Sequence, residues 1–469
     1  MSDIRYICIS DLHFGAYNSL LTGTDEKGFS DHSSDSPVLE HLLRIIENVL
    51  GSVNRKKRAR FILNGDIFEL ALANTNEAVM SFDSYLRLCF TKTRKEIFSD
   101  KLIFVPGNHD HHLWETARER QYLDYMTKFE PRDFISPPWH HTRMLKPKPL
   151  KSRFISTVMK RHKLLKSGRA LTVYPNLCLV NQDLKKYTVI THGHFIESMY
   201  FLMSHLSSVL LNSESFPETT DDIEKENFAW IDFFWSMLGR SGNAGLRVGV
   251  MYDMLQDEKG IQRLASNLIN YVMKTEKTSV SIQDFLKPAI NFLLTKIITG
   301  IAVNERGLTD DLLGKGALEG MYSYINGPLR LQFLEENNSV LPNHMDFIFG
   351  HTHKPFCRFY SGFSDSGYPD QIAVYNTGGW VADTVIPQKQ VGGAVSFIDE
   401  DLNIVLMRLY NENNFEIRFE SCNGEDNPLL EKLKAGIDLK SSLYYNFSRA
   451  VKEEIEKKRR IILSRIKQD

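Results

Sequence analysis

Five short motifs along the chain contain the side chains with which proteins bind divalent metal ions. Imidazole nitrogens together with carboxylate or amide oxygens suit borderline divalent metals. Two such ions about 3.5–4 Å apart can share a hydroxide and hold both the attacking and the leaving oxygen of a displaced phosphoryl group. The motifs are Asp11-Leu12-His13, Gly65-Asp66-Ile67-Phe68-Glu69, Gly107-Asn108-His109-Asp110, Thr191-His192-Gly193-His194 and Gly350-His351-Thr352-His353.

The motifs provide enough ligands for two metal sites with open positions. The candidate ligands are Asp11, His13, Asp66, Asn108, His192, His351 and His353. On an extended backbone, residues two apart point to the same side, so Asp11 and His13 can reach one position, as can His351 and His353. Glycines at positions 15, 65, 107, 193 and 350 suit tight turns where the backbone passes close to a metal or phosphate.

The elements around the first three motifs predict a parallel sheet. Apolar runs at Ile4–Ile9, 60–63 and 102–105 are strand-like, and helical spacing covers 37–50 and 81–98. This βαβαβ order favours a mostly parallel sheet. Each motif directly follows a strand, and ligands of open α/β sheets gather at the carboxyl ends of strands.

The remaining chain divides into further segments. Strand character resumes at 171–180 and 187–191, and a long stretch follows with helical patterns only. Residues 345–349, 372–375, 394–398 and 403–410 alternate like antiparallel strands, and the end of the chain forms a charged amphipathic helix. We therefore predict a catalytic domain from 1–194 and 343–420, a helical insertion or lid at 195–342, and a C-terminal helical tail at 421–469.

The ordered motifs resemble those of the calcineurin-like metallophosphoesterase superfamily. That resemblance implies an α/β fold, a four-layer α/β/β/α sandwich with two mixed sheets, here with a large and mainly helical insertion. It also implies that Asp11, His13 and His353 hold one metal, that Asp66 bridges, and that a second metal is held by Asn108, His192 and His351. His109 would lie beside the phosphate without binding metal and would donate a proton to the leaving oxygen.

Three further residues are candidates for roles near the metals. Glu69 stands where the superfamily often has an acid that orients the histidine corresponding to His109, and Asp110 is the rival partner, so both join His109 in the predicted catalytic set. A carboxylate bonded to an imidazole fixes its tautomer. Asn108 and His194 are the predicted substrate contacts. For His111 and His112, at a predicted helix start, a structural role is favoured over substrate contact.

A closer resemblance concerns one branch of the superfamily. The Gly65–Glu69 motif, the long insertion and Gly350-His351-Thr352-His353-Lys354-Pro355 look like the UDP-diacylglucosamine pyrophosphatases, which place a helical lid between these motifs. Those enzymes typically carry an arginine where this chain has His109, and their lid is much shorter. The resemblance therefore implies a lid and not a substrate.

The sequence thus predicts a hydrolase of phosphomonoesters or phosphodiesters in which a hydroxide bridging two metals attacks phosphorus in line. Manganese is the first expectation for the metals, with iron, zinc, nickel or cobalt as alternatives. Two other functions stay open. One is a nucleotide or sugar-nucleotide pyrophosphatase acting on a lipid-linked substrate, and the other is a non-catalytic metal-binding scaffold.

Composition narrows the possible partners and compartment. The net charge of -1 provides no overall attraction for nucleic acid or anionic lipid, although residues 143–169 are strongly basic. We interpret that segment as a solvated surface in preference to a binding site for phosphate groups. The five cysteines are scattered without metal-site spacing. Because we find neither a signal peptide nor a membrane span, we expect a cytoplasmic protein; the sequence does not indicate its oligomeric state.

Overall fold

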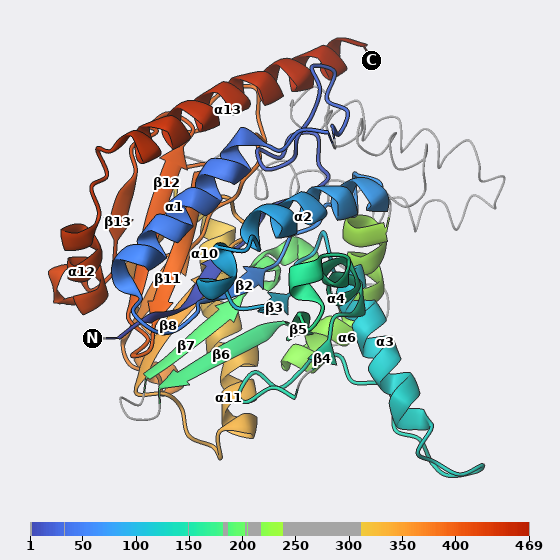
Figure 1. Cartoon of the computed structure of the whole chain (residues 1–469). Helices are drawn as coiled ribbons and strands as arrows, with labels where there is room; N and C mark the ends of the chain where they lie inside the picture. The colour runs from blue at the N-terminus through green and yellow to red at the C-terminus, as the bar shows by residue number, and fades with distance from the viewer. Residues whose placement is uncertain are drawn as a thin grey trace, which may run out of the picture.

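The computed structural model describes residues 2–31, 33–148, 150–181, 186–201, 204, 217–237 and 311–468. Much of the predicted insertion, residues 238–310, lies outside the described residues. What is described forms two packed sheets with helices on both outer sides (Figure 1).

The first sheet has eight strands and carries the first three motifs. Strands β1, β2, β3 and β5 run parallel, and the remaining four join antiparallel. The predicted parallel arrangement around these motifs is therefore confirmed. In spatial order the strands are β13 (Arg418–Glu420), β12 (Ile404–Asn411), β11 (Gly392–Asp399), β1 (Ile4–Ile9), β2 (Arg60–Asn64), β3 (Lys101–Val105), β5 (Arg169–Thr172) and β4 (Leu150–Lys151).

The second sheet has five strands and carries the last two motifs. Their order is β6 (Asn176–Asn181), β7 (Lys186–Thr191), β8 (His344–Phe349), β10 (Gln371–Asn376) and β9 (Phe356–Ser361). Strands β7, β8 and β10 are parallel, so the antiparallel prediction is wrong for 345–349 and 372–375, although it is right for 394–398 and 403–410. The chain passes through edge strand β9 between β8 and β10, which gives those two the same direction.

Three apolar clusters separate four layers. Between the sheets lie residues such as Cys8, Ile62, Ile103, Ile190 and Ile348. A second cluster joins the first sheet to outer helices, and a third joins the second sheet to helices from the predicted insertion. The four-layer α/β/β/α arrangement is thereby confirmed.

The helices are placed by these clusters. On the first sheet they are α1 (Pro37–Val53), α2 (Thr75–Cys89), α4 (Arg153–Lys160), α12 (Pro428–Gly436) and α13 (Ser442–Gln468). On the second they are α6 (Thr220–Ile231), α10 (Lys315–Tyr324) and α11 (Arg330–Glu336), while α3 (His112–Met126) follows the third motif. Short turns of other helix types are η1 (Arg94–Glu96), η2 (Lys163–Leu165), η3 (His194–Ile196), η4 (Ser198–Phe201), η5 (Asp232–Met237), η8 (Ile325–Leu329), η9 (Ser364–Ser366) and η10 (Gly424–Asp426).

Local sequence explains where helix α1 begins and how the C-terminal helix packs against it. Helix α1 begins with Pro37 in its first turn, and the Ser36 hydroxyl accepts a hydrogen bond from the Leu39 N–H, which caps the helix. Helix α13 runs beside α1 in Figure 1 and buries Tyr444, Phe447 and Val451 in the same cluster. The predicted C-terminal tail therefore packs on the outer face of the first sheet.

The basic segment 143–169 contributes apolar residues to both clusters under the outer helices: Met144, Leu145 and Leu150 to that of the second sheet, and Ile155, Val158 and Met159 to that of the first. Helix α4 buries Ile155, Val158 and Met159, while Lys160, Arg161 and the other basic side chains of the segment are exposed. The segment therefore presents a solvated basic face. In the part of the chain that is described, no helix is long and apolar enough to cross a membrane.

Candidate metal centre

The ligand motifs sit on tight turns at the carboxyl ends of five strands from both sheets. Strands β1, β2 and β3 of the first sheet end just before Asp11, Asp66 and Asn108, and β7 and β8 of the second end before His192 and His351. The candidate ligand atoms of these turns lie close together, so the five turns meet at one edge of the sandwich.

Many ligands lie in left-handed backbone conformations that side chains rarely adopt. The φ angles are between 46° and 64° for Asp11, His13, Asp66, His351 and His353. Each such residue costs free energy and persists only where the surrounding structure enforces it, typically at functional sites. The local strain therefore marks the same residues that the motifs identify.

Glycines allow these turns to approach one another. A Cβ at Gly65 would stand 2.3 Å from His192 Nδ1, and one at Gly350 would stand 2.3 Å from Asp11 Oδ2. A Cβ at Gly107 would meet Asp66 Oδ1 at the same distance. Alanine at any of the three would displace a candidate ligand, which explains the glycines in the motifs.

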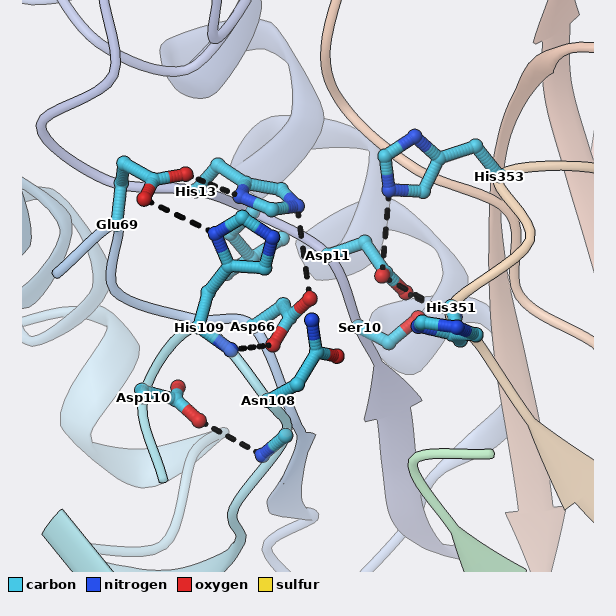
Figure 2. A network of polar contacts seen from close by, with 12 residues as sticks. Ser10, Asp11, His13, Asp66, Glu69, Asn108, His109, Asp110, His351 and His353 are labelled. Carbon is cyan, nitrogen blue, oxygen red and sulfur yellow. Dashed lines mark hydrogen bonds and ion pairs between the residues drawn. The ribbon is translucent and has the colours of Figure 1, made fainter. Parts of the chain in front are cut away.

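A first group of ligand atoms comes from Asp11, His13 and His353, which lie within 4.8 Å of one another. His353 Nε2 is 3.4 Å from Asp11 Oδ1 (Figure 2). The other ring nitrogens face carboxylates: His13 Nδ1 donates to Glu69 Oε2 at 3.0 Å, and His353 Nδ1 donates to Asp383. This arrangement leaves Nε2 of both imidazoles for a metal.

A second group comes from Asp66, His192 and His351, again within 4.8 Å. His192 Nε2 lies 3.3 Å from Asp66 Oδ2 and 3.0 Å from the Asn108 amide oxygen. His192 Nδ1 donates to the backbone carbonyl of Asn64 at 3.1 Å. All seven predicted ligands are thus brought together, four around His192 and three around His353.

Asp66 lies between the two groups. Its Oδ2 is 3.3 Å from His192 Nε2 of the second group and 3.8 Å from His13 Nε2 of the first. Its Oδ1 accepts a hydrogen bond from the His109 backbone N–H at 2.8 Å. One carboxylate thus faces both groups, as a bridging ligand must.

The electrostatics and the unpartnered atoms fit divalent cations. Burial by itself raises the pKa of Asp66, but neighbouring histidines, His192 foremost, hold it well below its ordinary value. Burial lowers the pKa of His192, yet the Asp66 carboxylate outweighs this effect and raises it to about 9. Among the described residues, the buried Nε2 atoms of His13 and His351 have no hydrogen-bond partner. These are atoms that a metal would take in place of protons.

Glu69 connects the first group to His109. While Oε2 accepts from His13, Oε1 is 3.0 Å from His109 Nδ1 and also accepts from the Ala71 and Leu72 N–H groups. Burial raises the pKa of Glu69, but the two histidines outweigh it and bring the value to about 2. Figure 2 shows Glu69 as the shared partner of both rings.

Asp110, the rival partner for His109, faces backbone. Its Oδ1 accepts from the Gly107 N–H at 2.7 Å, and its Oδ2 accepts from the N–H groups of Ile67 and Phe68 at 2.8 and 3.3 Å. Burial, followed by the Asp66 charge, raises the pKa of Asp110 to about 7. In these contacts Asp110 ties the second and third motif turns together.

His194, predicted to contact substrate, lies in a buried polar network. Its Nε2 is 3.1 Å from the Tyr174 hydroxyl, which donates to Glu224 Oε2 at 2.8 Å. Glu224 Oε1 accepts from His111 Nε2 at 2.6 Å. Burial lowers the pKa of His111, but Glu224 and Asp232 outweigh it and raise the value to about 9. Helix α6 is thereby docked onto the third and fourth motifs.

Several neighbours of the metal centre were not predicted from the sequence. Asp383 backs His353, Glu197 Oε2 lies 3.5 Å from His351 Nε2, and the rings of Tyr200 and Trp235 pack beside His351 and His109. None belongs to a motif with characteristic spacing. The only available signal was position, because Glu197 and Tyr200 closely follow the fourth motif.

Comparisons with known proteins agree with this geometry. A family model described as calcineurin-like phosphoesterase matches residues 4–355, which include all five motifs. No curated protein matches the chain significantly. Among solved structures, the crystal structure of a cold-active protein-tyrosine phosphatase of a psychrophile, Shewanella sp., shares 13% identity over 88% of this chain and 80% of that chain. Its TM-score of 0.24 supports no argument about fold or activity. Since the family model spans most of the chain, the protein belongs to the calcineurin-like phosphoesterase family.

Proposed function

We propose that the protein hydrolyses phosphate esters at a centre of two divalent metal ions, with manganese as the first candidate. The observation that carries this proposal is Asp66, whose Oδ2 faces His13 Nε2 at 3.8 Å and His192 Nε2 at 3.3 Å. When bound, a pair of divalent ions supplies a nucleophile at neutral pH and neutralises charge on the phosphoryl oxygens.

The ligands divide between the two ions according to the two groups. Asp11, His13 and His353 would hold the first ion. His192, His351 and the amide oxygen of Asn108 would hold the second, and Asp66 would be shared. Their buried imidazole nitrogens and carboxylate oxygens match the borderline metals that this donor set favours.

His109 would protonate the leaving oxygen. Glu69 Oε1 accepts from Nδ1 at 3.0 Å, which fixes the ring, and in the imidazolium form the opposite nitrogen carries the proton that would be donated. The backbone N–H of His109 donates to Asp66 Oδ1 at 2.8 Å. This backbone hydrogen bond therefore links the loop of the proposed proton donor directly to the proposed bridging carboxylate.

The proposal is tested by turnover of p-nitrophenyl phosphate and bis-p-nitrophenyl phosphate with added manganese, alongside metal analysis of the purified protein. Hydrolysis of at least one substrate, abolished by chelation and restored by manganese, supports a phosphoesterase. Two bound metals without turnover of either substrate would instead favour the non-catalytic scaffold. Asp66→Asn provides the control, because it should reduce both metal content and turnover.

A further inference from the structure

A cavity of about 710 Å³ opens between the two sheets beside edge strand β6. Strands β1, β2, β3 and β5 of the first sheet and β6 and β7 of the second all contribute to its lining. None of the seven candidate metal ligands is among its described lining residues, and neither is His109. The cavity therefore has the volume of a pocket for a small organic ligand and is distinct from the candidate metal centre.

The walls of this cavity are largely aliphatic. Ile103, Val173, Leu177 and Leu179 belong to the apolar cluster between the sheets, and at this edge they line the cavity. Val180, near the end of β6, lines it too and is 36% exposed. An aliphatic chain that displaces water from such walls is stabilised by the hydrophobic effect.

Arg60 brings a positive charge to the inner face of the first sheet. It pairs in register with Tyr6, whose ring packs against the cluster between the sheets. Side chains alternate along a strand, so Arg60 points to the same face as Ile62 of that cluster. Arg60 is partly buried, lines the cavity and has no ion-pair partner among the described residues. A partly buried charge is costly unless an opposite charge approaches it, so this position favours an anion.

Glu336 is the only acid among the described lining residues, and its charge is already used. Its Oε1 accepts from the Met144 N–H at 3.0 Å, and its Oε2 accepts from the Leu145 N–H at 2.9 Å. The same Oε2 lies 3.7 Å from Arg143 Nε. Glu336 therefore fixes the loop that borders the cavity and offsets the charge of Arg143, but it leaves the other cations unbalanced.

Two lysines of that loop add to the positive charge of Arg60. Lys146 and Lys148 line the cavity, are exposed, and have no ion-pair partner in the part of the chain that is described. Lys146 has a φ of 49°, a conformation that costs free energy and persists where the surrounding structure enforces it. Three unbalanced cations thus stand beside an aliphatic wall, which suits a ligand that has both an anionic and an apolar part.

The end of the cavity at Arg60 lies away from the candidate metal ligands. Arg60 begins β2 and Tyr187 stands near the start of β7, whereas Asp66 and His192 follow the far ends of the same strands. Five or six residues of extended chain correspond to roughly 16–20 Å. An anionic group beside Arg60 is therefore too far away to bind the metals at the same time.

We propose that this cavity binds an amphiphilic anion, an aliphatic chain that ends in a carboxylate or phosphate group. The chain lies against the aliphatic walls from β3, β5 and β6, and the anionic group is held by Arg60 with Lys146 and Lys148. The site is separate from the metal centre, so this inference does not depend on the proposed phosphoesterase function.

The test is calorimetric binding of dodecanoate and of dodecylphosphonate to the manganese-loaded protein, below the concentrations at which these compounds form micelles. At least one of them should bind saturably, and the tighter of the two identifies the preferred anionic group. Dodecyltrimethylammonium, with the same chain and the opposite charge, should bind much more weakly. Shortening the chain by two carbons should weaken binding roughly 10-fold, because each buried methylene contributes to affinity.

Variants of the three cations locate the binding. Arg60→Gln should weaken binding of the anion by about 10-fold or more, whereas Arg60→Lys, which keeps the charge, should retain most of the affinity. The double variant Lys146→Gln/Lys148→Gln changes only exposed positions and should weaken binding several-fold, so it replaces Arg60→Gln as the probe if that variant misfolds. Lys160→Gln is the matched control, because it removes an exposed cation of the same basic segment that does not line the cavity.

Chelation of manganese separates this site from the metal centre. Binding of the anions should survive chelation, because no candidate metal ligand lines the cavity. Loss of binding on chelation would place the anions on the metals and overturn the proposal. So would the absence of saturable binding, equal binding of dodecyltrimethylammonium, or unchanged affinity in folded Arg60→Gln. Each of these results leaves the phosphoesterase proposal intact, since that proposal is tested by turnover of the p-nitrophenyl esters.

Discussion

The two candidate metal sites differ in what lies behind their histidines. In the first site, His13 and His353 each turn Nδ1 toward a carboxylate, Glu69 and Asp383. In the second site, His192 turns Nδ1 toward the backbone carbonyl of Asn64. A carboxylate behind a ligand imidazole makes that imidazole a stronger ligand. We therefore expect the first site to bind its ion more tightly than the second.

An acid also lies near the second candidate site. Glu197 Oε2 is 3.5 Å from Nε2 of His351, but neither Glu197 oxygen has a hydrogen-bond partner among the described residues. Glu69 and Asp383, in contrast, each accept a hydrogen bond from a candidate ligand imidazole of the first site. On the proposed assignment of the ligands, we therefore expect the first ion to be held more firmly and the second to exchange more readily.

Asp66→Asn should have the largest effect because it removes the carboxylate that faces both sites. We expect metal content to fall at both positions and kcat/KM to fall by roughly 10³–10⁵, in line with several kcal/mol of lost charge stabilisation. Metal analysis and turnover of bis-p-nitrophenyl phosphate are the measurements. Two fully occupied sites in this variant would refute the shared role of Asp66.

His109→Ala should separate chemistry from metal binding. His109 touches Asp66 through its backbone N–H, which the substitution preserves, while the side chain that would donate a proton is removed. Turnover should fall by roughly 10²–10⁴ with metal content near that of wild type. If the variant lost metal from either site, His109 would have to be reassigned as a ligand.

The ligand turns were predictable because residue type and spacing coincide within a few positions after each strand. Asp11-Leu12-His13 and His351-Thr352-His353 each carry their chemistry in three residues. Glu197 and Asp383 gave no such signal. Each is a single acid outside any motif, and the histidine near it is distant in the sequence: His351 for Glu197 and His353 for Asp383. The parallel pairing of β8 with β10 was mispredicted, because a partial alternation over four or five residues was interpreted as the sign of antiparallel strands. In the structure both strands are buried on both faces except at their first residue, as parallel strands usually are.

The metal-free protein should lose stability as the pH rises above about 6.5. The folded-state pKa of His192 is about 9, against an ordinary value of 6.5, because Asp66 outweighs the effect of burial; that of His353 is raised as well, by Asp383 and Asp11. A raised histidine pKa contributes stability that is fully present below the unfolded value and is lost as pH rises through the folded value. For His192 the loss is about 3 kcal/mol at most.

Thermal melts of chelator-treated protein between pH 6 and about 10 would measure this loss, with manganese-loaded protein as the control. Bound ions replace the protons on these imidazoles, so the loaded protein should show a flatter profile over the same range. Identical profiles with and without metal would contradict the assignment of His192 and His353 as ligands.

Asp383→Asn should have the smallest effect and bears most directly on the contrast between the sites. Asp383 accepts from His353 Nδ1, and its amide replacement would weaken that imidazole as a ligand without touching His109. We expect the affinity of the first site to fall about 10–100-fold, the usual cost of losing such a partner, while the second site keeps its affinity. Manganese titration of apoprotein would resolve the two steps, with Asp365→Asn, an exposed acid in η9, as the matched control. Glu69→Gln should lower affinity at the same site and also reduce turnover, because Glu69 holds both His13 and His109. If Asp383→Asn weakened the second site as much as the first, the carboxylate behind His353 would stabilise the whole centre, and the proposed difference between the two sites would be wrong.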